Sequence, residues 1–230
     1  MLTAAPTRTP RTTLGALCLA LGALGFVAVT LINPYGASDD QVRVIREHSP
    51  TLAVYSLVWF ATSLLLVAGA ATLVGRVRER GGATTLIGGT LAGAGAVASA
   101  AVAAFESVAI TLGSALPDDK TLTTAVKAFD QSTVLSVVFF TYLAGTALGW
   151  PILVAGTARA GILSAWYVLP VVLGLIGQAA LAGDSPRALI VVIAACFVVP
   201  LMTLASRIHR VSPAAPSVDP SRPAPVHELT

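Results

Sequence analysis

The sequence predicts an all-α protein, a polytopic membrane helix bundle with six transmembrane helices and both termini cytoplasmic. Of its 230 residues, 55% are hydrophobic and 11% are charged, whereas roughly 25% are charged in a soluble domain. The mean hydropathy is +0.82. The net charge of +3 does not indicate nucleic-acid binding, because the basic residues lie at the ends of apolar runs and form no basic face. The lipid bilayer is therefore the expected surrounding of the chain.

Six apolar runs are candidate spans, because about 20 apolar residues cross the ~30 Å hydrocarbon layer. They cover residues 14–32, 51–74, 86–112, 133–154, 162–182 and 188–205, and together define a transmembrane domain at 14–206. Residues 1–13 form a polar N-terminal tail, and 207–230 form a Pro-rich tail whose composition predicts disorder. The first run could instead be a signal peptide, but it is longer than a signal core and no A-x-A-like site follows it closely.

The distribution of Lys and Arg predicts the orientation. The two tails and the even-numbered loops contain nine basic residues, and the odd-numbered loops contain five. Basic residues are enriched on the cytoplasmic side of membrane proteins. Both termini are therefore expected in the cytoplasm of a multi-pass plasma-membrane protein.

The odd-numbered loops contain helix-start signals. Ser38 and Gln41 are spaced as a capping box before a short surface helix. In the third connection, Asp118 and Asp119 precede an amphipathic segment that is expected to continue as a helix into the fourth span. An Asp-Asp pair also occurs 79 residues earlier, at Asp39. Two matching dipeptides are weak support for an internal repeat.

The third run, 86–112, combines small residues with the only acidic residue inside any long apolar run. Small side chains allow close helix contacts in lipid, so this helix is expected at the centre of the bundle, although a lipid-facing alanine helix is the alternative. The expected packing residues are Gly89, Gly93, Ala92, Ala96 and Ala100. An Ala96→Leu substitution is accordingly expected to disturb assembly.

Glu106 is the main candidate for a functional residue. Counting from the start of the third run places it at the outer edge of the bilayer. It could be a protonatable or cation-attracting group at the mouth of a cavity, or a carboxylate that reaches the headgroups and pairs with Lys127 or Arg187. We expect it to face the bundle. The further candidates are Gln178, Asp130 and Arg187.

No catalytic pattern is visible in the sequence. The three histidines lie outside the apolar runs, and the HExxH, Walker and GxSxG motifs are absent. One oxygen-rich group could form an outer cation site: Asp39, Asp40, His48, Asp118 and Asp119. The acids already suit helix N-termini, so neither a metal nor a cofactor is expected, and the protein is not expected to be an enzyme.

The chain has twelve Arg against two Lys, Ala/Val/Gly-rich spans and a Pro-rich tail from Ser212. In these features it resembles the uncharacterised six-helix membrane proteins of actinobacteria. It implies a plasma-membrane protein and no particular activity. We expect a non-enzymatic accessory, sensing or interaction subunit that contacts another membrane protein or a second copy. The alternative is a small solute or ion transporter or channel that uses Glu106.

Overall fold

The computed structural model describes residues 10–35, 40–180 and 187–208, and all regular secondary structure in these ranges is helical. The helices are α1 (Pro10–Ile32), α2 (Gln41–Glu47), α3 (Ser49–Ala115), α4 (Asp119–Asp130), α5 (Thr133–Ala144), α6 (Trp150–Arg159), α7 (Val168–Ala180) and α8 (Arg187–Arg207). A π-helical turn, η1 (Gly145–Gly149), joins α5 to α6, and a 3-10 turn, η2 (Ala165–Tyr167), precedes α7.

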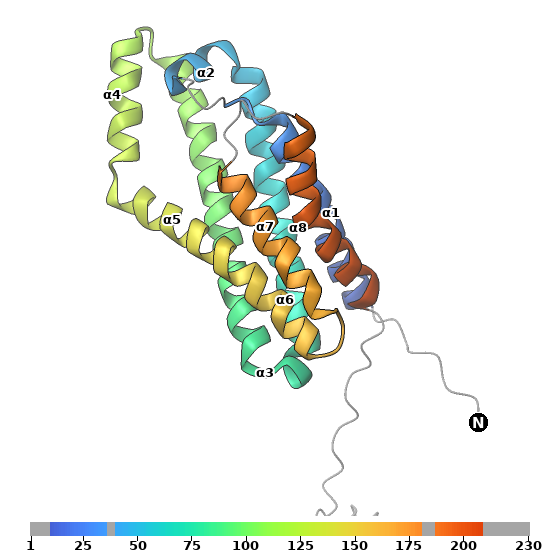
Figure 1. Cartoon of the computed structure of the whole chain (residues 1–230). Helices are drawn as coiled ribbons and strands as arrows, with labels where there is room; N and C mark the ends of the chain where they lie inside the picture. Colours follow the sequence, from blue (N-terminus) through green and yellow to red (C-terminus); the bar gives the residue numbers. More distant parts are fainter. Residues whose placement is uncertain (1–9, 36–39, 181–186, 209–230) are drawn as a thin grey trace, which may run out of the picture.

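Five helical segments in the described ranges are long and apolar enough to cross a membrane: Pro10–Ile32, Ser49–Val77, Gly82–Ala115, Thr133–Arg159 and Leu189–Arg207. A shorter apolar helix covers Ala165–Gly177. The described part of the chain is thus all-helical, and five of its helical segments have the length and the apolar composition of membrane-spanning helices. The described starts of α1 and α8 lie at opposite ends of the bundle, so Pro10 and Arg207 lie at the same end (Figure 1).

Three helix boundaries differ from the sequence expectation. Helix α1 begins at Pro10, inside the predicted tail. The segment after Asp118 does not continue into the fourth span, because Ser132 caps a new helix by accepting a hydrogen bond from the Leu135 N–H at 3.1 Å. The predicted fifth span starts late, since Gly161 at φ 74° closes α6 and leaves 162–164 in a turn.

Helix α2 is capped differently from the predicted capping box. Its N-cap is Asp40, whose side chain accepts a hydrogen bond from the Val42 N–H at 3.0 Å. Ser38, the expected cap, lies outside the described residues. An Asp carboxylate suits this position because it satisfies a free N–H and faces the positive end of the helix dipole.

The main core lies between α1, both halves of α3, α6, α7 and α8. Helix α3 reverses direction at Gly82, whose φ of 55° is accessible mainly to glycine. Fully buried side chains fill the space between the helices: Leu19, Leu73, Trp150, Leu153, Phe197, Leu201 and Leu204. The rings of Phe26 in α1 and Phe197 in α8 lie 4.5 Å apart between centroids, so the first and last described helices pack together.

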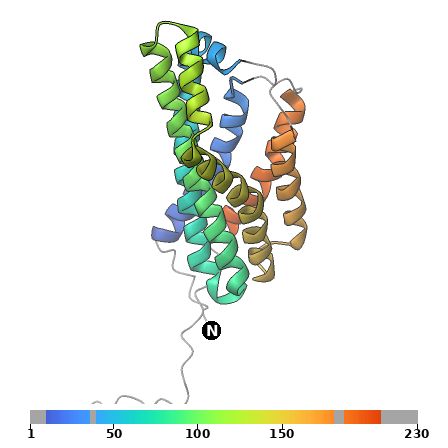
Figure 2. The ribbon, with the colours of Figure 1, turned by 90° about the vertical axis from the view of Figure 1, so that its left-hand side faces the viewer.

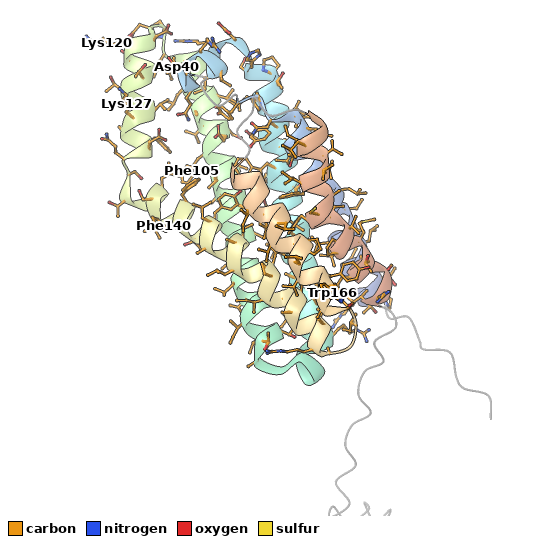
Figure 3. All side chains as sticks on the ribbon, in the orientation of Figure 1. Asp40, Phe105, Lys120, Lys127, Phe140 and Trp166 are labelled. Carbon is orange, nitrogen blue, oxygen red and sulfur yellow. The ribbon has the colours of Figure 1, made fainter. Side chains whose placement is uncertain are left out.

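A second, smaller core lies at the end of the bundle that holds α2 and α4 (Figure 1). It consists of Val29, Val42, Ile45, Leu52, Tyr55, Leu122 and Val126. Amphipathic α4 turns its buried side chains towards this core, and Lys120 and Lys127 lie on the side of α4 that faces away from α3 (Figure 3).

The second half of α3 meets the α5–η1–α6 helix at a contact made of glycines. Helix α5 crosses α3 diagonally (Figure 2), and the two backbones touch where Gly95 faces Gly145. A Cβ added at Gly95 would lie 2.7 Å from the carbonyl carbon of Gly145. Pro151 follows the π-helical turn, and since it lacks an N–H it cannot make the ordinary α-helical bond to the preceding turn.

The expected packing residues of α3 differ in their surroundings. Ala92, Ala96 and Ala100 are buried. A Cβ at Gly89 would collide with Val74, but one at Gly93 would meet nothing within 4 Å. The face of closest approach is therefore the one that carries Gly88 and Gly95, and Gly93 does not belong to it.

The N-cap of α4 should make this helix sensitive to acid. Hydrogen bonds from the side chain and the N–H of Thr121 to the Asp118 carboxylate lower the pKa of Asp118 below its ordinary value of 3.8. The folded state therefore gains stability from this cap above pH 3.8, and loses it as the pH falls through the lower pKa of the folded state. We expect the protection of the amides of 119–123, measured relative to their intrinsic exchange rates, to fall below about pH 4.

An Asp118→Asn variant is the control for this prediction. Asparagine caps helices about as well as aspartate but does not titrate in this range. Its amide exchange in 119–123 should change no more over the same pH interval than the intrinsic exchange rate does. A pH response equal to that of the original chain would contradict the assignment.

Candidate functional site

Glu106 lies in the second half of α3, nine residues before the end of that helix at Ala115. Its side chain is half-buried, and its Oε2 accepts a hydrogen bond of 2.6 Å from the hydroxyl of Tyr35. Tyr35 follows α1 in a turn in which its N–H donates to the Asn33 side chain at 3.1 Å. The Glu106 carboxylate thus points into the protein.

Glu106 also lines a cavity of about 300 Å³, here called the Glu106 cavity. It lies between α2, the second half of α3, α4 and α5. Its lining comprises Gln41, Val102, Phe105, Glu106, Val108, Ala109, Leu112, Val126, Phe129, Asp130, Leu135, Ser136 and Phe139. Four of these side chains are polar and the rest are apolar, so the cavity combines an apolar wall with few polar groups, as ligand sites commonly do.

Within the described part of the chain, no basic side chain forms an ion pair with Glu106. Lys127, one of the two expected partners, is exposed. The side chains of Arg187, the other expected partner, and of Gln178 lie outside what the structure describes. The partner that the structure does show is the neutral Tyr35.

Asp130 brings a second carboxyl group to the Glu106 cavity, from the last residue of α4. Asp130 is exposed at the edge of the cavity, and its partial desolvation there raises its pKa above its ordinary value. The rings of Phe105 and Phe129 close one wall of the cavity, with centroids 5.5 Å apart and a T-shaped arrangement; Figure 3 shows Phe105 on the side of α3 next to α4. Two acids therefore share a mainly apolar, aromatic-walled space.

Tyr35 is the residue of this site that sequence reasoning missed. Burial raises the pKa of Tyr35 far above its ordinary value, and the negative charge of Glu106 and the hydrogen bond to it act in the same direction. The hydroxyl therefore stays protonated and remains a donor. Tyr35 and Glu106 are 71 positions apart in the chain, so no local spacing could have revealed the pair.

A second cavity, of about 200 Å³, lies deeper in the bundle and is called the aromatic cavity here. It is lined by Phe26, Val29, Asn33, Tyr55, Trp59, Thr62, Ser63, Leu66, Ala96, Ser99, Tyr142, Thr146, Trp150 and Phe197. Trp59 Nε1 donates to Ser99 Oγ at 2.7 Å, and Ser63 Oγ lies 2.9 Å from Ser99 Oγ. Polar groups thus continue from the Glu106 region into the bundle.

The acids weighed for a metal site have other contacts in the structure. Asp40 and Asp118 cap α2 and α4, and Asp119 accepts a hydrogen bond from Arg46 Nε at 3.2 Å. Asp39 lies outside the described residues. Elsewhere in the described ranges, no group of three or more His, Cys, Asp or Glu side chains has metal-site geometry.

The fold and the site together define an all-helical protein with several helices suited to cross a membrane and a carboxylate-bearing cavity between α2, α3, α4 and α5. Comparisons with protein-family models, with curated proteins and with solved structures find no match for this chain. The geometry of the two cavities is therefore what bears on the function of this chain.

Proposed function

We propose that this membrane protein binds a small organic cation in the Glu106 cavity, as the solute site of a transporter or channel. One observation carries the proposal: Glu106 faces a cavity of about 300 Å³ and, among the described side chains, its partner is neutral Tyr35 instead of a basic residue. A half-buried carboxylate without a cationic partner attracts a positive charge. Asp130 on the same cavity strengthens that attraction.

The lining favours an organic cation over a metal ion. Ca²⁺ takes six to eight oxygen ligands, and Mg²⁺ needs near-octahedral coordination. The Glu106 cavity instead surrounds its acids with apolar side chains and the paired rings of Phe105 and Phe129. Such walls bind the apolar body of an ammonium or pyridinium compound, while Glu106 neutralises its charge.

An accessory or interaction subunit is the second candidate. The observation that favours it is the exposed apolar surface of α5, where Phe140 is 73% exposed and no residue of the helix is buried. A membrane-protein partner or a second copy could cover this surface. Lipid tails would cover it equally well, so the Glu106 cavity gives the stronger argument.

The proposed arrangement in the plasma membrane has six crossings with both termini in the cytoplasm. The common end of Pro10 and Arg207 supports an even number of crossings (Figure 1). The short apolar helix Ala165–Gly177 would be the additional crossing. The excess of Lys and Arg in the tails and even-numbered loops supports the cytoplasmic assignment.

The proposal is tested by measuring the binding of N-ethylpyridinium to the purified full chain in detergent micelles, by equilibrium dialysis. We expect saturable binding that the Glu106→Gln variant weakens at least about tenfold, which corresponds to about 1.4 kcal/mol. The uncharged isostere ethylbenzene should not compete for the site, because it lacks the positive charge that Glu106 attracts.

Glu47→Gln is the matched control. Glu47 lies in α2 near the same end of the bundle, its side chain is 60% exposed, and it does not line the cavity. The same chemical change at Glu47 should alter the affinity by less than about twofold, since exposed charges contribute little. Equal affinities for the original chain and the Glu106→Gln variant would refute the proposed function.

A further inference from the structure

The aromatic cavity is not explained by cation binding at Glu106 alone. It has about two thirds of the volume of the Glu106 cavity, and none of the described residues that line it is charged. Its polar groups are hydroxyls, the Asn33 amide and the Trp59 indole. A site of this composition has no charge of its own with which to bind an inorganic ion.

The walls of this cavity are suited to hold an organic cation through aromatic faces. Tyr55, Trp59 and Tyr142 form a continuous row, with ring centroids 5.3 Å apart for the first pair and 6.1 Å for the second. The hydrogen bond from Trp59 Nε1 to Ser99 fixes the indole in this row. Aromatic faces attract organic cations, and the attraction is strongest at sites without water.

Tyr35 and Tyr55 connect the two cavities. Tyr35 donates to Glu106, which lines the Glu106 cavity, and its ring lies 6.4 Å from that of Tyr55, which lines the aromatic cavity. The connection is made of one hydrogen bond to the Glu106 carboxylate and one edge contact between two rings, and neither is covalent. A side-chain movement of Tyr35 would therefore be enough to change the contact between the cavities.

We propose that the aromatic cavity is a second binding site for the same organic cation, held there by the faces of Tyr55, Trp59 and Tyr142 instead of by a carboxylate. This inference rests on the proposed function. The Glu106 cavity attracts the solute by charge, and the aromatic cavity holds it deeper in the bundle. Because the second site holds the cation without a carboxylate, the cation can dissociate from Glu106 and still be bound by the protein.

Tryptophan fluorescence can test this proposal in the full chain. Of the three tryptophans, Trp59 and Trp150 line the aromatic cavity, and Trp166 is 81% exposed. A Trp166→Phe variant therefore reports on the aromatic cavity. Pyridinium ions quench indole fluorescence at contact distance, so N-ethylpyridinium should quench this variant in a saturable manner.

Two sets of variants make the result specific. A Trp59→Phe/Trp150→Phe variant keeps only exposed Trp166, and its quenching should rise linearly with the N-ethylpyridinium concentration. Ala96→Leu adds bulk to a buried residue of the cavity wall. In the Trp166→Phe background it should raise the half-saturation concentration at least about tenfold. Because added bulk at Ala96 is also expected to disturb assembly, the quenching is measured on folded protein that still shows Glu106-dependent binding by dialysis.

Tyr142→Leu is the second variant, for use if Ala96→Leu fails to fold. It removes one ring of the row without adding bulk, and it should also raise the half-saturation concentration. Linear quenching of Trp59 and Trp150, together with Glu106-dependent binding by dialysis, would overturn the second site and leave the proposed function intact. Saturable quenching without Glu106-dependent binding would overturn the proposed function and, with it, the claim that both sites hold one solute.

Discussion

The Gly95→Ala variant is expected to lose about 3 kcal/mol of unfolding free energy, at the upper end of the usual cost of overpacking a core. The added Cβ would lie 2.7 Å from the carbonyl carbon of Gly145 and 2.7 Å from the amide nitrogen of Thr146. Both atoms belong to a helix backbone, so no side chain can rotate away to make room. The α5–η1–α6 helix must move as a unit. Reversible unfolding in mixed micelles measures the loss.

Gly93→Ala is the matched control, because it makes the same change in the same helix two residues earlier. A Cβ at Gly93 meets nothing within 4 Å. Alanine in a helix interior is favoured over glycine by roughly 0.5–1 kcal/mol, so this variant should be as stable as the original chain or slightly more stable. Similar stabilities for the two alanine variants would contradict the close contact.

Combining Gly95→Ala with Gly145→Ala tests whether the two glycines meet. A Cβ at Gly145 would lie 2.5 Å from the Gly95 Cα. Once the first substitution has pushed the helices apart, the second should cost less than it does alone, because interacting sites are not additive. Strict additivity of the two losses would show that the glycines act at separate contacts.

The Arg46→Ala variant is expected to lose about 2–3 kcal/mol, because a charged donor leaves several acceptors unpaired. The Arg46 guanidinium donates to the carbonyls of Gly113 and Leu116, and to Asp119. The two carbonyls stand at the end of α3, where no N–H of the helix can reach them. These hydrogen bonds of Arg46 link α2 to the end of α3 and to the start of α4.

Amide exchange localises this loss. We expect faster exchange in 41–47 and 119–126 in the Arg46→Ala variant, with the main core unaffected. Lys120→Ala is the control, since Lys120 is exposed on the same end of the bundle, and it should leave both segments protected. An Arg46→Lys variant should recover only part of the stability, because a single ammonium cannot reproduce the forked geometry of a guanidinium.

Hydropathy predicted the helical class and the approximate positions of the long apolar helices, because the composition of a span depends on the solvent that surrounds it. The sequence was less informative about helix ends. Ser132 lies between two helical segments. The sequence did not show whether Ser132 caps a new helix or lies within one continuous helix. The gap between the predicted spans 133–154 and 162–182 includes Gly161, but the sequence did not show that α6 continues to Arg159 or that the turn extends past Gly161, since glycine also occurs inside membrane helices.

The sequence predicted that α3 makes a close contact with another helix, but it did not predict which face of α3 makes it. Gly89 and Gly93 form a Gly-x-x-x-Gly pair, yet the helix uses the face of Gly88 and Gly95. Small residues occur on several sides of α3, so the pattern did not show which side meets a partner. The matching pair on the other helix, Gly145 and Gly149, has the same spacing and could have been found from it.

The Glu106 site depends on contacts that no local pattern contains. The sequence singled out Glu106 because an acid inside an apolar run is rare. It could not show that the acid bonds to Tyr35 or that α4 folds back beside α3 to bring Asp130 to the same cavity. These placements depend on how the helices pack.

The packing of α1 against α8 limits the order in which this protein can assemble. During synthesis α1 emerges before α8, because the ring of Phe197, on which Phe26 packs, is about 170 residues behind it in the chain. Until α8 emerges, that side of α1 must be covered by lipid or by another helix. Closure of the bundle is therefore a late event in biosynthesis. In a chain halted before α8, the side of α1 that normally packs on α8 would have no helix of this bundle against it.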